Sequence, residues 1–209
     1  MFLLLFVQLA GATTQTPAPA ARSPATTPTI LVLGDSLSAA YGIRMEEGWV
    51  ALLQKKLASQ GYGYRVVNAS ISGETTAGGL ARLPRALDLH RPRIVILELG
   101  GNDGLRGLPL RQMRTNLESM VKQSQATGAK VLLAGMRVPP NYGPTYTEGF
   151  YDSFSDIAKR YRVPLVPFFL RSVALEEGLM QADGIHPNAK GQPALLDTLW
   201  PTLRPLLKK

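Results

Sequence analysis

The sequence predicts an α/β protein in which a parallel sheet of five strands carries helices on both faces. Two observations predict this class. Five short apolar runs alternate along the chain with segments whose apolar residues recur at helical spacing, and strands that alternate with helices form parallel sheets. The runs at residues 29–33 and 94–99 are almost wholly apolar, as strands covered on both faces must be.

The strands are expected where short β-prone runs end at polar or turn-forming residues. Pro164 and Pro167 flank or end the last run, and proline cannot donate to a sheet ladder, so this strand is predicted to be short and at an edge. The five predicted strands are residues 29–33, 64–68, 94–99, 130–136 and 165–167.

The helices are expected between these runs, where the apolar period changes to that of a helix. Pro92 stops the second helix, Gly128 stops the third, and Pro164 follows the fourth. Glycine and proline are the usual residues just beyond a helix end. The five predicted helices are residues 48–60, 76–90, 110–127, 145–161 and 189–207.

The first 28 residues differ in composition from the rest. Residues 2–12 are apolar and end in Ala10-Gly11-Ala12, the small-residue pattern of a signal-peptidase site. No Lys or Arg precedes them, and they are too few to span a bilayer. Residues 13–28 are rich in Pro, Ala and Thr, as disordered linkers are.

We therefore expect a signal-peptide-like segment at 1–12, a linker at 13–28 and one folded domain at 29–209. Cleavage near Ala12 would export the protein to the periplasm or the medium. The alternative is an apolar tail on a cytosolic protein. A chain of 209 residues suits a single domain, and nothing in it demands a partner subunit, so we expect a monomer.

Composition limits the function classes. Cys is absent, which excludes disulfides and thiolate nucleophiles. The net charge of +8 is spread along the chain, and only Lys55-Lys56 and Lys208-Lys209 form lysine pairs. No basic run with interleaved aromatics exists, so we predict no nucleic-acid binding and at most transient contact with an anionic membrane surface.

Polar motifs follow the first three predicted strands. Gly34-Asp35-Ser36 follows the first, Ser70-Ile71-Ser72-Gly73 the second and Gly100-Gly101-Asn102-Asp103 the third. Asp183-Gly184-Ile185-His186-Pro187 precedes the last helix. Because the carboxyl ends of parallel strands share one rim, the first three loops should lie together there. Each alone also fits an ordinary turn.

Ser36, His186 and Asp183 have the residue types of a hydrolytic triad. A serine hydroxyl is a weak nucleophile until a base takes its proton, and histidine is the usual base. Asp183 lies three residues before His186, close enough to orient its imidazole. A surface-polar helix start is the alternative for this pair, while His90, beside Arg91-Pro92, fits a helix cap.

An oxyanion formed on a substrate would need donors already in place. The Ser36 N–H, the N–H of Gly73 and the side-chain amide of Asn102 can supply them. Gly73 lets a substrate approach the backbone closely. For Gly73 and Asn102 taken separately, a turn role fits equally well.

Ser36, Gly73, Asn102 and His186 match in order the four blocks of the SGNH (GDSL) hydrolase superfamily. The stretches GDSLSAAYG, VVNASISGETTAGGLARLP, ELGGNDGLRG, RVPPNYGPTY, VPLVPFF and QADGIHPNAKGQP closely resemble the bacterial periplasmic thioesterase I, protease I, lysophospholipase and arylesterase group. The resemblance covers residues 29–207.

The resemblance implies a flavodoxin-like three-layer α/β/α sandwich with strand order 2-1-3-4-5. It implies Ser36 as nucleophile, His186 as base and Asp183 as orienting acid, with Ser36, Gly73 and Asn102 forming the oxyanion hole. The implied substrates are aryl and alkyl esters, acyl-thioesters and lysophospholipids, that is, small-molecule or lipid esters, cleaved without metal or cofactor.

Two other functions stay open at this point. One is a flavodoxin-like cofactor-binding module, whose first loop would hold a flavin phosphate; the acidic Asp35 there would repel it. The other is a sugar-ester (acetyl) esterase of the same superfamily. Position 38 is Ser, so G-x-S-x-G is absent. Asp183 and His186 alone are too few for a zinc site.

Residues around the motifs are expected to support them. Glu98 lies in an apolar strand and fits a hydrogen-bonded structural carboxylate. Asp35 is expected to brace the nucleophile loop, and Asp103 to brace Asn102. An acyl pocket is predicted from the loops at 75–80, 105–110 and 138–146. The predicted substrate-binding residues are Leu108, Pro109, Asn141, Tyr142, Tyr146 and Ile185.

Overall fold

The computed structural model describes residues 27–209. The predicted signal-peptide-like segment and all but the last two residues of the predicted linker lie outside the described residues. Within 27–209, no helix combines the length and apolar character needed to cross a membrane.

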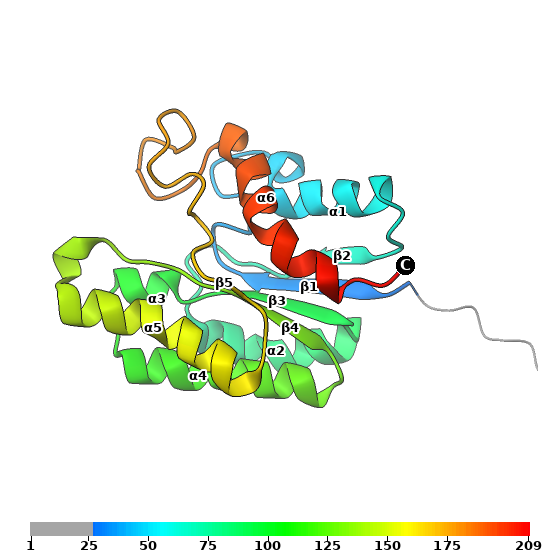
Figure 1. Ribbon diagram of the computed structural model, residues 1–209, viewed down its shortest axis with the longest axis horizontal. Helices are drawn as coiled ribbons and strands as arrows, with labels where there is room; N and C mark the ends of the chain where they lie inside the picture. The colour runs from blue at the N-terminus through cyan, green and yellow to red at the C-terminus, as the bar shows by residue number, and fades with distance from the viewer. Residues whose placement is uncertain (1–26) are drawn as a thin grey trace, which may run out of the picture.

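The centre of the fold is a parallel sheet of five strands in the order β2-β1-β3-β4-β5 (Figure 1). This confirms the predicted fold class and strand order. The strands are β1 (Thr29–Gly34), β2 (Arg65–Asn68), β3 (Ile94–Glu98), β4 (Lys130–Ala134) and β5 (Leu165–Val166).

Burial explains which runs became central strands. Every residue of β1 and β3 is buried, as expected for adjacent central strands covered on both faces. β5 has only two residues and lies at an edge, which confirms the reading of the prolines around it. Because all five strands run parallel, the loops that follow β1, β2 and β3 lie together at the carboxyl-terminal rim of the sheet.

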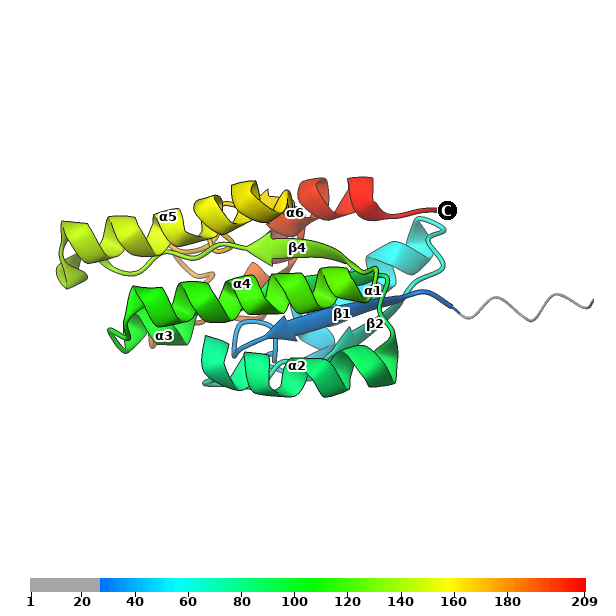
Figure 2. The same ribbon diagram turned by 90° about the horizontal axis from the view of Figure 1, so that it is seen from below.

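Helices cover both faces of the sheet (Figure 2). α1 and α6 pack together on one face, and α2, α4 and α5 form a row on the other. The helices are α1 (Trp49–Ser59), α2 (Thr76–His90), α3 (Gly101–Leu105), α4 (Leu110–Ala126), α5 (Pro144–Tyr161) and α6 (Gln192–Leu203).

Two predicted segments differ from the structure by more than one or two end residues. The segment after β3 was expected as a loop, but it forms the short helix α3. The predicted last helix at 189–207 is three pieces: the 3₁₀ turn Ala189–Gly191, α6, and the 3₁₀ turn Arg204–Leu206. Asn188 caps the first turn, its side-chain oxygen accepting from two backbone N–H groups.

The α1–α6 contact also fixes the segment that carries His186. The N–H of Trp49 donates to the side-chain oxygen of Gln192 at 3.0 Å, and Gln192 Nε2 donates to the Pro187 carbonyl at 3.2 Å. Both Trp49 and Gln192 are buried. The residue after His186 is therefore bonded to the core.

Candidate active site

The loop after β1 turns sharply enough to present Ser36 at the rim. Asp35 stabilises the turn, because its Oδ1 accepts the Leu37 N–H at 3.0 Å and its carbonyl accepts the Ala39 N–H at 2.9 Å. Asp35 is buried and Ser36 is half-buried. The nucleophile candidate thus lies at the start of a helical turn directly beyond a rigid strand.

His186 reaches Ser36 across the rim. Its Nε2 lies 2.8 Å from Ser36 Oγ, although 150 positions separate the two residues in the chain. The Gln181 N–H donates to the His186 carbonyl at 2.7 Å, and the adjacent Pro187 bridges to Met180. These bonds hold the imidazole in place from below.

Asp183 holds the other ring nitrogen. Its Oδ2 lies 2.7 Å from His186 Nδ1, and its Oδ1 accepts the N–H groups of Ile185 and His186 at 2.9 and 3.0 Å. Gly184 permits the tight turn, with φ +66°. The backbone N–H of His186, then its side chain, and the N–H of Ile185 lower the pKa of Asp183 to about 2. This carboxylate is ionised across the neutral range.

Tyr41 lies against the imidazole, and no motif in the sequence pointed to it. The Tyr41 and His186 ring centroids are 4.6 Å apart at an interplanar angle of 42°. Gln181 Nε2 donates to the Tyr41 carbonyl at 2.8 Å, so one glutamine ties the loop after β1 to the histidine loop. Its position shortly after the Ser36 turn was the one feature of the sequence that could have indicated a role at the site.

The other two rim loops are bonded to the first. The Ile71 N–H donates to the Gly34 carbonyl at 3.1 Å, and Asn102 Nδ2 donates to Asp35 Oδ2 at 3.1 Å. The structure therefore brings the Ser36, Gly73 and Asn102 loops together, as expected from the shared rim.

Arg106, a second residue that the sequence did not point to, fixes the Gly73 loop. Its Nη2 donates to the Gly73 carbonyl at 2.9 Å. Gly73 adopts φ +78°, a conformation that favours glycine. Among residues 27–209, neither the Ser36 N–H nor the Gly73 N–H has a protein acceptor. Both are free to bind an oxygen of a substrate.

Asp35 is buried and accepts hydrogen bonds from both the nucleophile turn and Asn102. Burial raises the pKa of Asp35 to about 6, while the hydrogen bonds from Leu37 and Asn102 and the charge of His186 partly oppose the rise. Asp35 braces Asn102 as well as its own loop.

Asp103 has a different partner from the one predicted. Its carboxylate accepts the N–H and the hydroxyl of Thr76 at 2.8 and 2.5 Å, and Asn116 Nδ2 donates to that hydroxyl at 3.0 Å. All three side chains are buried. Asp103 thus ties the short helix α3, which contains Asn102, to the start of α2, and it does not hydrogen-bond the Asn102 side chain.

Two predicted substrate residues are engaged in the loops around the rim. Tyr142 Oη donates to the Leu105 carbonyl at 2.6 Å and Tyr146 Oη to the Leu108 carbonyl at 2.9 Å. The two rings stack with centroids 5.9 Å apart. The first bond joins Tyr142, just before α5, to the last residue of α3, and the second joins Tyr146, in the first turn of α5, to the segment after α3.

The other predicted substrate residues are accessible. Leu108 and Ile185 are 36% and 45% exposed, and Pro109 and Asn141 are exposed as well. Ile185 directly precedes His186. Their contact with substrate stays a prediction.

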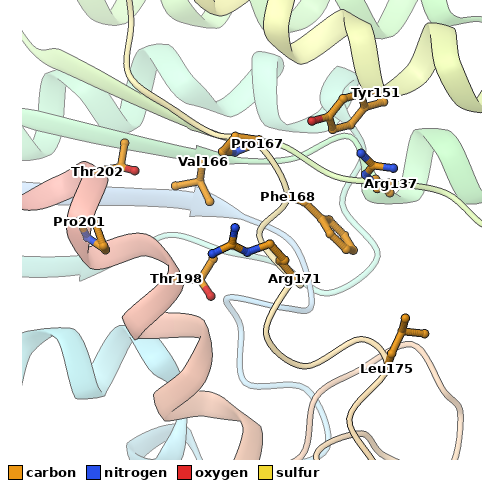
Figure 3. Close-up of a pocket in the computed structure, with 10 residues that line it drawn as sticks. All are labelled: Arg137, Tyr151, Val166, Pro167, Phe168, Arg171, Leu175, Thr198, Pro201 and Thr202. Atoms are coloured by element: carbon orange, nitrogen blue, oxygen red, sulfur yellow. The ribbon is translucent and has the colours of Figure 1, made fainter.

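Two other features lie apart from this site. A groove of about 650 Å³ between α5, β5 and α6 contains Arg171 and Thr198, with Arg137 over the Tyr151 ring (Figure 3). It shares no residue with Ser36, His186 or the predicted acyl pocket. His90 ends α2 shortly before β3 begins, so it lies at the amino-terminal end of the strands, away from the rim that contains Ser36. Within 27–209, no three His, Cys, Asp or Glu side chains are grouped as a metal site.

The chain is similar to known proteins in both sequence and fold. Residues 32–194 match the model of the GDSL-like lipase/acylhydrolase family. The chain is 58% identical over 179 residues to esterase TesA of Pseudomonas aeruginosa, covering 86% of this chain and 89% of the relative. It is 47% identical to thioesterase 1/protease 1/lysophospholipase L1 of Escherichia coli (strain K12), covering 86% and 85%. A crystal structure of TesA superposes with a TM-score of 0.84 at 58% identity, covering 86% of this chain and 99% of that one.

Proposed function

This chain belongs to the GDSL-like lipase/acylhydrolase family, and from that premise we propose how its residues cleave esters. The protein is a serine hydrolase of carboxylic esters and thioesters. The proposal assigns the nucleophile, base and orienting acid to Ser36, His186 and Asp183. The observation that carries it is the hydrogen-bonded series Ser36 Oγ–His186 Nε2–His186 Nδ1–Asp183 Oδ2, at 2.8 and 2.7 Å.

Acylation begins when Ser36 Oγ attacks the substrate carbonyl carbon and its proton passes to His186 Nε2. The carbonyl oxygen becomes an oxyanion. As the tetrahedral intermediate collapses, the bond to the leaving oxygen or sulfur breaks, and His186 returns its proton to that atom. The alcohol or thiol departs, and the acyl group stays as an ester on Ser36.

Deacylation repeats these steps with water. His186 takes a proton from the water as it attacks the Ser36 ester, and then returns a proton to Ser36 Oγ. The carboxylic acid leaves and loses its proton at neutral pH. Asp183, which is ionised there, keeps the proton on His186 Nδ1 so that Nε2 can accept, and it stabilises the imidazolium.

The oxyanion would be bound by the free N–H groups of Ser36 and Gly73 and by the second N–H of Asn102. Asn102 gives one N–H to Asp35 at 3.1 Å, and because a carboxamide is planar, this bond fixes the direction of the other. Donors held in place before the reaction stabilise developing charge without reorganisation. Arg106 and Asp35 are then the residues that position two of the three donors.

The acyl chain is proposed to lie along the rim between Ile185 and the segments around Leu108 and Tyr146. Leu108 and Ile185 expose apolar surface there. The Tyr146–Leu108 hydrogen bond joins two of the segments that would line the chain. Acetyl sugar esters are the competing substrates within the same chemistry. A flavin phosphate is disfavoured because the first loop contains the buried carboxyl of Asp35 and its serine is bonded to His186.

The proposal is tested by labelling and by substitution. A p-nitrophenyl alkylphosphonate should add one phosphonyl group to the protein, located on Ser36 by peptide mass spectrometry. Ser36→Ala should lose both the label and the hydrolysis of p-nitrophenyl esters and acyl-thioesters. Ser59→Ala, at the end of α1, is the matched control. Full activity in Ser36→Ala would overturn the assignment. Export, a monomeric state and contact with anionic membranes stay predictions from the sequence.

A further inference from the structure

Glu98 is a buried carboxyl group that the proposed mechanism does not use. It is the last residue of β3, and its exposure is 0% in a strand that is otherwise Ile, Val and Leu. Burying an ionised carboxylate is very unfavourable unless partners compensate for lost hydration. A fully buried acid directly beneath the nucleophile loop therefore calls for a physical explanation.

The contacts of Glu98 are with the nucleophile loop. Its Oε2 accepts the Ser38 hydroxyl at 2.5 Å and the Asp35 N–H at 3.4 Å. Gly34 pairs with Glu98 across β1 and β3, and a Cβ at position 34 would lie 2.6 Å from Oε2. The residues on both sides of Ser36 therefore wrap around this one carboxyl group.

The two carboxyl groups of Glu98 and Asp35 cannot both be ionised at low cost. Burial, and next the charge of Asp35, raise the pKa of Glu98 well above its ordinary value, and a hydrogen bond between the two carboxyl groups adds to the rise. Ser38 and the Asp35 N–H oppose it. The other charged groups facing the pair are His186 and Asp103, which act on Asp35.

Glu98 Oε1 supports the same protonation state. It is buried, and no N–H or hydroxyl group among residues 27–209 donates a hydrogen bond to it. A carboxylate would have an unsatisfied charged oxygen there, which is costly. A neutral acid has a hydroxyl that can donate to the neighbouring carboxylate.

We propose that Glu98 is a positioning residue that stays protonated at neutral pH and, as a neutral acid, holds Asp35 in the ionised form that orients the Asn102 amide. This rests on the proposed function, since the Asn102 amide matters as an oxyanion donor. The path runs from Glu98 to Asp35 and from Asp35 Oδ2 to Asn102 Nδ2. Glu98 touches no substrate atom in this scheme.

A neutral Glu98 also has an electrostatic consequence. The oxyanion forms at the rim just above the Asp35–Glu98 pair, and a second negative charge below it would oppose its formation. With one proton on the pair, a single negative charge remains. It lies on Asp35, which accepts the hydrogen bond from Asn102. The scheme moves no proton during turnover, so the atoms and charges of the hydrolysis are unchanged.

Three variants separate this role from a merely structural one. Glu98→Gln keeps the shape and the neutrality of the side chain. It also keeps an oxygen that accepts from Ser38 and the Asp35 N–H and a group that can donate to the Asp35 carboxylate, so it should retain most of the wild-type kcat. Glu98→Leu removes every polar contact and should lower kcat by roughly 10²-fold, the size of a lost oxyanion donor, with KM little changed. Adding Glu98→Leu to Asn102→Ala should cause little further loss, because both changes remove the same donor.

Infrared spectroscopy reads the protonation state directly. The C=O stretch of a buried carboxylic acid should be present in the wild-type protein at neutral pH and absent from Glu98→Gln. Absence of this band from the wild type would overturn the proposal, as would a loss in the double variant equal to the product of the single losses. Should Glu98→Leu fail to fold, the infrared comparison with Glu98→Gln still decides.

The outcome is separable from that of the proposed function. If Ser36→Ala keeps full activity, the proposed function fails. If Ser36→Ala is inactive but Glu98→Leu, folded by circular dichroism, keeps the wild-type kcat, only the role of Glu98 fails.

Discussion

Replacing Asp183 by Asn tests whether the carboxylate acts through the tautomer of His186. The amide oxygen of Asn can still accept the N–H groups of Ile185 and His186, which Asp183 Oδ1 accepts at 2.9 and 3.0 Å. The loop should therefore keep its turn. What changes is the partner of His186 Nδ1, now 2.7 Å from Asp183 Oδ2, because an amide N–H would donate to it.

The expected loss follows from where the imidazole proton then lies. With Nδ1 accepting, the proton moves to Nε2, the atom that must take the proton of Ser36 Oγ at 2.8 Å. An imidazole in the wrong tautomer cannot act as the base, which costs kcat about 10⁴-fold in a triad, whereas binding of the ground-state substrate is retained. KM should change little.

The pH dependence of stability gives a second test, in which the direction of the effect is fixed. The folded pKa of Asp183 is about 2, below its ordinary 3.8, so its ionised form stabilises the folded state. That contribution is complete above pH 3.8 and is lost as the pH falls through about 2. The stability difference between wild type and Asp183→Asn should therefore narrow over this range in urea unfolding.

The assay is steady-state hydrolysis of p-nitrophenyl butyrate near neutral pH, with circular dichroism to confirm the fold. Asp152→Asn is the matched control, because Asp152 is exposed on α5. A folded Asp183→Asn variant that kept more than about a tenth of the wild-type kcat would refute the tautomer argument. A fall in kcat in the control would show that the assay reports stability instead.

Three further changes test other parts of the site. Asn102→Ala should lower kcat by about 10²-fold or more with KM nearly unchanged; an effect confined to KM would exclude Asn102 from the oxyanion hole. Gly34→Ala places a Cβ 2.6 Å from Glu98 Oε2, so urea unfolding should show a loss of about 1–3 kcal/mol, and an unchanged midpoint would contradict the packing argument. Leu108→Ala should reduce kcat/KM for long-chain p-nitrophenyl esters more than for the acetate, because each buried methylene contributes about 0.8 kcal/mol. An unchanged chain-length preference would remove Leu108 from the acyl pocket.

The sheet could be predicted because its strands are buried on both faces. Solid apolar runs such as those of β1 and β3 have few alternative explanations. The short helix α3 could not be predicted, because Gly100, Gly101, Asn102 and Asp103 have the composition of a turn. α3 is held by distant contacts instead: Asp103 bonds Thr76, and Gly104 packs so closely on Phe150 that a Cβ there would lie 2.5 Å from its ring.

The residues that carry the proposed chemistry could be selected from the sequence because three polar motifs follow apolar strands and the chain contains only two histidines. Their supports could not. Arg106 and Tyr41 act through a carbonyl and a ring that only the fold places beside them. Asp103 was assigned the wrong partner for the same reason. Proximity in sequence to Asn102 suggested a local brace, whereas the carboxylate turns toward α2, a separate element of the fold.

Asp183 and Glu98 show why residue type alone could not divide the acids by role. Asp183 is 37% exposed in its side chain and accepts hydrogen bonds from two backbone N–H groups, which favour its ionised form. Glu98 is fully buried beside another carboxyl group, which favours its neutral form. The ionised Asp183 therefore lies beside His186, which becomes positive during the reaction. The neutral Glu98 adds no negative charge near the carbonyl oxygen that becomes the oxyanion. Two acids placed in opposite environments can serve one reaction in opposite protonation states, and exchanging their surroundings would disable both the base and the oxyanion site.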